Sequence, residues 1–160
     1  LLTNCGFQPL YGQQTGSTAG TPRGSTVSDM AYVAVDTIPD RAGQLVRNFL
    51  LDGLHPKGAA PRQVFRLVID LVQRQEGLAF QQDDSATRYN LRLGARFKLV
   101  DTRTDTSLLK GHTQAIAAYN VVRSDYANLI SEKDALRRAA KIVAEGIQVQ
   151  ISVYFSRLRG

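Results

Sequence analysis

The chain has 160 residues, of which 43% are hydrophobic and 21% charged, a composition typical of a folded globular protein rather than a disordered one. Twenty Lys and Arg against 14 Asp and Glu give a net charge of +6, which favours anionic partners such as nucleic acid, anionic lipid or phosphorylated glycolipid. The length suits one domain, and no apolar run approaches the roughly 18 residues that a membrane-spanning helix needs.

The only cysteine, Cys5, follows a short apolar segment at the start of the sequence. Leu2, Thr3 and Asn4 before it have the outline of a lipobox, the end of a bacterial lipoprotein signal peptide, although Gly, Ala or Ser is more usual at the last position. We predict that residues 1–4 are a signal-peptide remnant and that Cys5 is lipidated. The alternative is an ordinary thiol in an N-terminal tail.

The next segment is rich in Gly, Ser and Thr. Residues 13–28 lack hydrophobic periodicity, which is typical of a flexible linker. We therefore predict a lipidated N-terminus and tether over residues 5–29, followed by a single domain over residues 30–160.

The domain is predicted to begin with a strand and a helix. Residues 31–38 are apolar and β-branched, and Pro39 ends them. Asp40 then supplies an N-cap for a helix whose apolar residues recur at helical spacing up to Leu54, and which ends within residues 53–58.

Three further strands are predicted. Apolar and polar residues alternate over residues 63–73, which predicts a strand. Residues 74–85 are polar, and we predict a loop or an extended hairpin there. Residues 88–99 alternate strictly, which predicts one buried and one solvated face. The buried face would carry Tyr89, Leu91, Leu93, Ala95, Phe97 and Leu99. A turn over residues 102–106 returns the chain as an antiparallel strand over residues 107–120.

The chain ends in a predicted long helix. Residues 124–125 and 131–134 both offer helix-start chemistry, and the second pair of signals fits a capping box, so the helix is placed after it. The element order predicts an α+β two-layer sandwich, in which a four-stranded, largely antiparallel sheet packs against two helices.

The sequence shows no pattern typical of an enzyme. His55 and His112 have no neighbouring Ser, Cys or carboxylate in the arrangement of a triad or a metal site, and we interpret them as surface or cap residues. No Gly-rich phosphate loop lies between a strand and a helix. We therefore predict no catalytic residues, no metal and no cofactor.

The solvated face of strand 88–99 is the best candidate site. It carries Arg88, Arg92, Arg96 and Lys98, to which Arg66, Lys110 and His112 would add if the strand register agrees. Guanidinium groups bind phosphate and carboxylate, so the row suits an anionic ligand. The alternative is an ordinary solvated sheet face. The absence of aromatic residues from this row argues against nucleic-acid binding. A second basic cluster, on the last helix, is interpreted as a solvated face; its members are Lys133, Arg137, Arg138 and Lys141.

Several short segments carry a family resemblance. They are residues 5–12 (CGFQPLYG), 38–44 (IPDRAGQ) with 47–48, 84–91 (DSATRYNL), 124–127 (SDYA), and 134–135 followed by 138–139. In this order and spacing they resemble the lipopolysaccharide-assembly lipoprotein family, LptE, in its alphaproteobacterial form.

The resemblance implies an outer-membrane lipoprotein, anchored by its lipid on the periplasmic side, that plugs the lumen of the β-barrel LptD and takes part in inserting lipopolysaccharide into the outer leaflet. It also implies lipopolysaccharide binding by basic residues, which we carry over as a hypothesis to Arg88, Arg92, Arg96 and Lys98. The main alternative is a stand-alone periplasmic lipoprotein that binds or carries an anionic lipid. It would need an apolar cavity, whereas Ala139, Ala140 and Gly146 favour tight packing.

Overall fold

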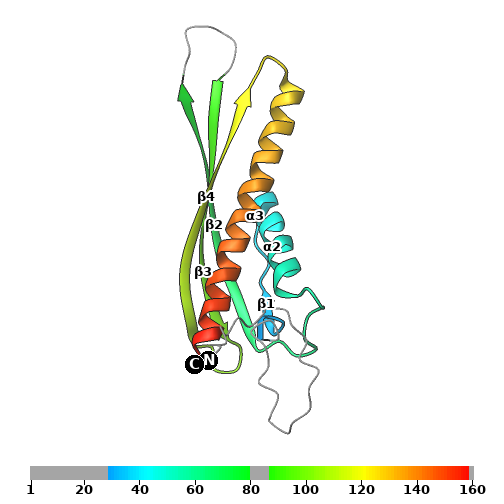
Figure 1. Cartoon of the computed structure of the whole chain (residues 1–160), viewed down its shortest axis with the longest axis vertical. Coiled ribbons are helices and arrows are strands. Elements are labelled where there is room, and N and C mark those ends of the chain that lie inside the picture. Colours follow the sequence, from blue (N-terminus) through cyan, green and yellow to red (C-terminus); the bar gives the residue numbers. More distant parts are fainter. Residues whose placement is uncertain (1–28, 80–86, 159–160) are drawn as a thin grey trace, which may run out of the picture.

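The computed structural model describes residues 29–79 and 87–158. The predicted signal-peptide remnant (residues 1–4), the predicted lipidation site Cys5 and residues 5–28 of the predicted tether lie outside this part of the chain. Its elements are, in chain order, β1 (Val33–Val35), α2 (Asp40–Leu54), β2 (Phe65–Ala79), β3 (Thr87–Asp101), β4 (Ser107–Val121) and α3 (Asp125–Arg157) (Figure 1).

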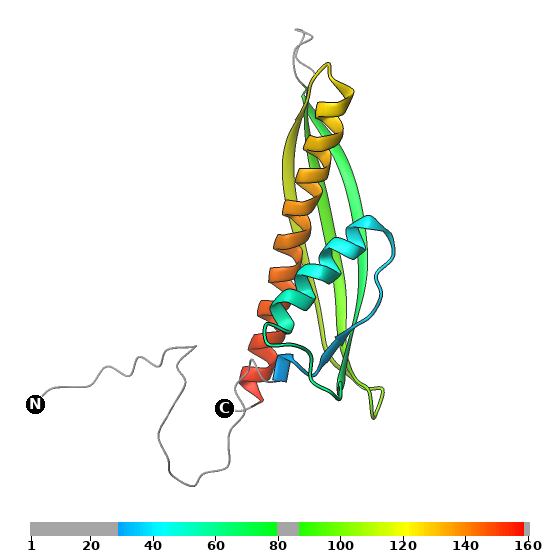
Figure 2. The ribbon, with the colours of Figure 1, turned by 90° about the vertical axis from the view of Figure 1, so that its right-hand side faces the viewer.

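The four strands form one open sheet in the order β1-β2-β3-β4. β1 runs parallel to β2, and the β2–β3 and β3–β4 pairs are antiparallel. Both helices contribute to a single core on one face of this sheet, and the molecule is long and narrow (Figure 2). The predicted α+β sandwich with a largely antiparallel sheet is confirmed.

The alternation in β3 is confirmed by its burial. Leu91, Leu93 and Leu99 are fully buried, and Ala95 and Phe97 are nearly so. The intervening Arg96 and Lys98 are exposed. Because successive side chains of a strand point to opposite faces, covering one face with helices leaves the basic residues on the other.

Two strand predictions were wrong in extent. β1 has only three residues, since the chain leaves the sheet after Val35. β2 continues to Ala79, beyond the predicted strand end at residue 73, so that residues 74–79 follow the extended-hairpin alternative rather than the loop. Residues 73–76 of this strand are polar and exposed on both faces, and their backbone pairing with β3 holds them in the sheet without burial. This long hairpin extends beyond the end of α2 (Figure 1).

Both helix starts also differ from prediction. α3 begins at Asp125, and its N-cap Ser124 accepts a hydrogen bond from the Ala127 N–H at 3.4 Å. The predicted capping box therefore lies within the helix. In α2 the N-cap position is held by Pro39, and Asp40 is the first helical residue with φ of +66°. Asp40 therefore adopts the left-handed backbone conformation at the tight turn into the helix, which residues other than glycine rarely adopt.

Small residues bring α3 close to β4. Ala139 and Ala140 are fully buried, and a Cβ at Gly146 would lie 2.6 Å from Thr113 Oγ1. Gln150 Nε2 donates to the His112 carbonyl at 3.0 Å, and an Arg138 guanidinium N–H donates to the Ala118 carbonyl at 3.1 Å. The predicted tight packing between these layers is present.

An aromatic pair lies on the inner face near the hairpin end of the sheet. Tyr89 and Tyr119 stack with ring centroids 5.9 Å apart, and Gln75 Nε2 donates to Glu132 Oε1 at 2.6 Å across the same layer. The pKa of Tyr119 is raised above its usual 10.0 by burial, by the negative charge of Glu132 and by Tyr89.

The first prediction tests the assignment of the sheet faces. Leu93→Ala should lower the free energy of unfolding by about 2 to 5 kcal/mol, because Leu93 is fully buried and its truncation leaves a cavity in the core. Ile116→Ala is the matched control, since its side chain is 48% exposed on the opposite face and should cost well under about 1 kcal/mol. Urea unfolding measures both, and equal losses would contradict the assignment.

The second prediction concerns alkaline pH. A raised pKa of Tyr119 means that the folded protein holds this proton more tightly than the unfolded chain, so its contribution is complete below about pH 10 and is lost as the pH rises through the folded-state pKa. Urea unfolding between roughly pH 9 and pH 11 should therefore show a smaller alkaline loss of stability in Tyr119→Phe than in the parent. Identical slopes would show that Tyr119 ionises equally in both states.

Candidate functional site

The candidate site is the outer face of the sheet, opposite the helices. The strand register places its side chains in rows that cross β2, β3 and β4. From the β1 end towards the hairpin, these rows include Val68–Lys98–Lys110, Asp70–Arg96–His112, Val72–Gly94–Gln114 and Arg74–Arg92–Ile116. Positive charge therefore gathers in rows separated by an uncharged one.

The four predicted site residues share this face but do not form one cluster. Arg88 and Lys98 are ten positions apart on a strand, a separation of about 33 Å. Only Arg96 and Lys98 line a common hollow. Arg92 instead pairs with Glu76 at 3.4 Å, and Arg88 lies opposite Asn120 near the hairpin.

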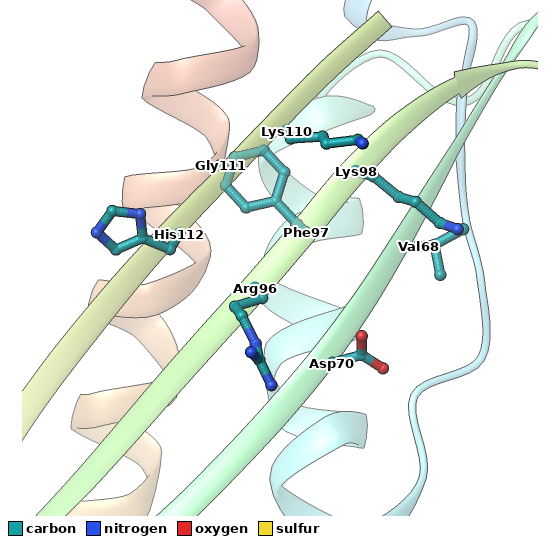
Figure 3. Close-up of a pocket in the computed structure, with 8 residues that line it drawn as sticks. All are labelled: Val68, Asp70, Arg96, Phe97, Lys98, Lys110, Gly111 and His112. Atoms are coloured by element: carbon teal, nitrogen blue, oxygen red, sulfur yellow. The ribbon is translucent and has the colours of Figure 1, made fainter. Parts of the chain in front are cut away.

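The hollow has a volume of about 480 Å³. It is lined by Val68, Asp70, Arg96, Phe97, Lys98, Lys110, Gly111 and His112 (Figure 3). The register brings Lys110 opposite Lys98 and His112 opposite Arg96. The expectation that Lys110 and His112 extend the basic row is therefore confirmed at this end of the sheet.

Arg66 lies on the same face but has its charge compensated. One guanidinium nitrogen is 3.7 Å from Asp36 Oδ2 and another is 3.4 Å from Asp105 Oδ1. These carboxylates come from segments distant in sequence from Arg66, so the sequence pattern gave no sign of the pairing.

The remaining candidates have structural positions. His55 Nε2 lies 2.9 Å from the Val33 carbonyl and thereby joins the end of α2 to β1. The basic residues of the second predicted cluster are exposed on α3, where Arg138 pairs with Asp134 at 2.8 Å and Lys141 with Glu145 at 3.9 Å.

In residues 29–79 and 87–158, no three His, Cys, Asp or Glu side chains are grouped to hold a metal ion. No helix of that part of the chain has the length and apolar character needed to cross a membrane.

Solved structures of two bacterial lipoproteins have a similar fold. A crystallised candidate lipoprotein from Caulobacter crescentus CB15 aligns with a TM-score of 0.70 at 22% identity, over 82% of this chain and 96% of that one. A minor lipoprotein from Acinetobacter baumannii aligns with a TM-score of 0.53 at 18% identity, over 76% and 90%. Both share the fold.

A search of curated proteins found no match. The family model described as LptE, lipopolysaccharide-assembly, matches residues 29–151, which is most of the chain and nearly all of the described structure. The chain therefore belongs to the LptE family of lipopolysaccharide-assembly lipoproteins, a non-catalytic family of the bacterial cell envelope.

Proposed function

We propose that this chain is a non-enzymatic outer-membrane lipoprotein, anchored through Cys5 on the periplasmic side, that plugs an LptD-type β-barrel and takes part in inserting lipopolysaccharide into the outer leaflet. The family match over residues 29–151 is the observation that carries this proposal. Membership of the family supports a role in lipopolysaccharide assembly. The lipid anchor, the barrel partner and the glycolipid contacts are what we propose in addition.

The shape and surface of the domain support a place inside a barrel. α3 has 33 residues, so it is about 50 Å long. The hairpin formed by β2 and β3 runs alongside it, which gives a narrow body (Figure 2). The lumen of a large outer-membrane barrel is polar, and the outer sheet face presents Arg, Lys, Asn and Gln side chains to such a surface.

The same face supports contact with lipopolysaccharide. Arg88, Arg92, Arg96 and Lys98 point away from the core, so a ligand can reach them without any change in packing, and a ligand at Arg92 would replace its ion pair with Glu76. Phosphate groups accept charge-assisted hydrogen bonds from guanidinium and ammonium groups. We therefore propose these four residues as contacts for the phosphates of the glycolipid.

The interior of the domain gives less support to a free lipid carrier. A carrier holds acyl chains in an apolar chamber, but α3 packs closely on β4 at Gly146, and Ala139 and Ala140 are fully buried in a core of large apolar side chains. Acyl chains would have to displace this packing, which costs free energy for every buried side chain that loses its contacts.

The barrel partnership predicts stable co-purification. A tagged full-length chain, extracted with a mild detergent from native outer membranes, should recover a large β-barrel protein in stoichiometric amount by mass spectrometry. A Cys5→Ala chain tests the anchor in parallel, because it should leave the membrane fraction. Recovery of the chain alone, or with soluble periplasmic proteins, would contradict the plug and favour the free carrier.

The glycolipid contacts predict weaker binding when the four charges are removed. Replacing Arg88, Arg92, Arg96 and Lys98 with Gln should lower affinity for purified lipopolysaccharide by at least about tenfold while the circular dichroism melting curve is retained. The matched control removes three Arg and one Lys elsewhere, at exposed positions of the helical layer and loops: Arg41, Lys57, Arg62 and Arg137. Equal losses in the two variants would show a net-charge effect without a site.

A further inference from the structure

Ion pairs compensate some cations of the outer sheet face but not others; among the described residues, Arg74, opposite Arg92, has no ion pair either. Arg66 is paired with Asp36 and Asp105, and Arg92 with Glu76. Within the described residues, Arg96, Lys98 and Lys110 make no ion pair and no side-chain hydrogen bond. These three cations surround the 480 Å³ hollow, so uncompensated positive charge and a recess in the surface coincide.

The strand register sets the spacing of these cations. Lys98 and Lys110 are direct cross-strand partners, whose Cβ atoms in an antiparallel pair lie about 5 Å apart. Arg96 precedes Lys98 by two positions on β3, which places it about 7 Å away along the same face. Three cationic groups on flexible side chains can therefore converge on a single anionic group above the sheet.

The arrangement is unfavourable without an anion. Like charges directly opposite each other destabilise a strand pair, and no carboxylate pairs with Lys98 or Lys110 among the described residues. Asp70, across from Arg96, is the one acidic residue that lines the hollow, and it makes no ion pair with Arg96. A bound phosphoryl group would relieve the repulsion between the two lysines.

The hollow has room for more than a phosphate ion. The hollow is shallow and open to solvent, and its volume of about 480 Å³ leaves space for a larger polar group above the sheet. Asp70 and His112 provide polar groups at its side, which suit the hydroxyl groups of a sugar or of glycerol, while Val68 adds an apolar wall (Figure 3). These features fit a phosphorylated headgroup better than a bare anion.

We propose that Lys98, Lys110 and Arg96 form a subsite for the phosphorylated headgroup of an anionic lipid, separate from Arg88 and Arg92 at the hairpin end. This inference rests on the proposed function, because it assigns one part of the same face to a headgroup. The shared chemistry is a phosphoryl group beside hydroxyl groups, and the membrane offers it in two forms, a phosphorylated glycolipid and an anionic glycerophospholipid.

The test uses the full-length chain and phosphatidylcholine vesicles in three forms: pure, with diphosphorylated lipid A, and with phosphatidylglycerol. Lys98→Gln/Lys110→Gln should partition about 25-fold less than the parent into at least one anionic vesicle, at about fivefold for each cation removed. The matched control is Lys57→Gln/Lys133→Gln, two exposed lysines away from the hollow, which should retain most of the parent's partitioning. Lys98→Arg/Lys110→Arg keeps the charges and should also retain binding.

The vesicle that shows the loss identifies the source of the headgroup. A loss with lipid A alone indicates the glycolipid, and a loss with phosphatidylglycerol alone indicates the phospholipid. A loss with both indicates a subsite that recognises the phosphoryl group itself. Partitioning of Lys98→Gln/Lys110→Gln equal to that of the parent in both anionic vesicles would overturn the subsite.

A second pair separates this inference from the proposed function. Arg88→Gln/Arg92→Gln removes two charges from the hairpin end of the same face. If this pair loses lipid A binding while Lys98→Gln/Lys110→Gln keeps both lipid A and phosphatidylglycerol binding, the subsite is wrong and the glycolipid contact stands at the other end. If neither pair changes lipid A binding, the proposed glycolipid contacts of the outer face fail, and the subsite stands only where Lys98→Gln/Lys110→Gln loses phosphatidylglycerol binding. Thermal unfolding of each variant verifies that the domain remains folded.

Discussion

The structure depends on one constraint, which is that its sheet is covered on a single face. The apolar residues of β3 from Leu91 to Leu99 are buried beneath the helices. Strand geometry then leaves the alternate residues, among them Arg96 and Lys98, without any layer above them. The hydrophobic core and the basic face are therefore two results of one alternating pattern, and neither can be moved by a register shift without exposing the core.

The contact between α3 and β4 holds the helix against the inner face of the sheet. Small residues let the helix approach the strand closely, and Gln150 and Arg138 donate to carbonyls of His112 and Ala118 on β4. Such close packing disfavours the alternative of a free lipid carrier, which would need room for acyl chains in its interior. The proposed ligand contacts accordingly lie on the surface of the domain.

The distribution of charge on the outer face then matters more than the net charge of +6. Arg66 and Arg92 are held by carboxylates and contribute little free potential, whereas Lys98, Lys110 and Arg96 face a shared hollow. A fold that keeps two lysines opposite each other on neighbouring strands loses some stability. An anionic lipid headgroup is the kind of ligand that would recover it in the cell envelope.

The sequence by itself determined the alternation of β3, the presence of α2 and the order of the elements, because these follow from the period of the apolar residues and from local helix signals. It also determined the family, through short segments in a fixed order. It failed at β1 and at the end of β2, where length depends on pairing with a neighbour and not on local pattern.

Only the tertiary structure decided which basic residues remain without a partner. Lys98 and Lys110 meet through the register of two strands, and Arg66 is compensated by Asp36 and Asp105 from segments far from it in the chain. Charges interact through space over a few ångströms, and residue spacing along the chain does not fix those distances. The four basic residues that the sequence grouped along β3 therefore separate into Arg96 and Lys98 at the hollow, the ion-paired Arg92 and the distant Arg88.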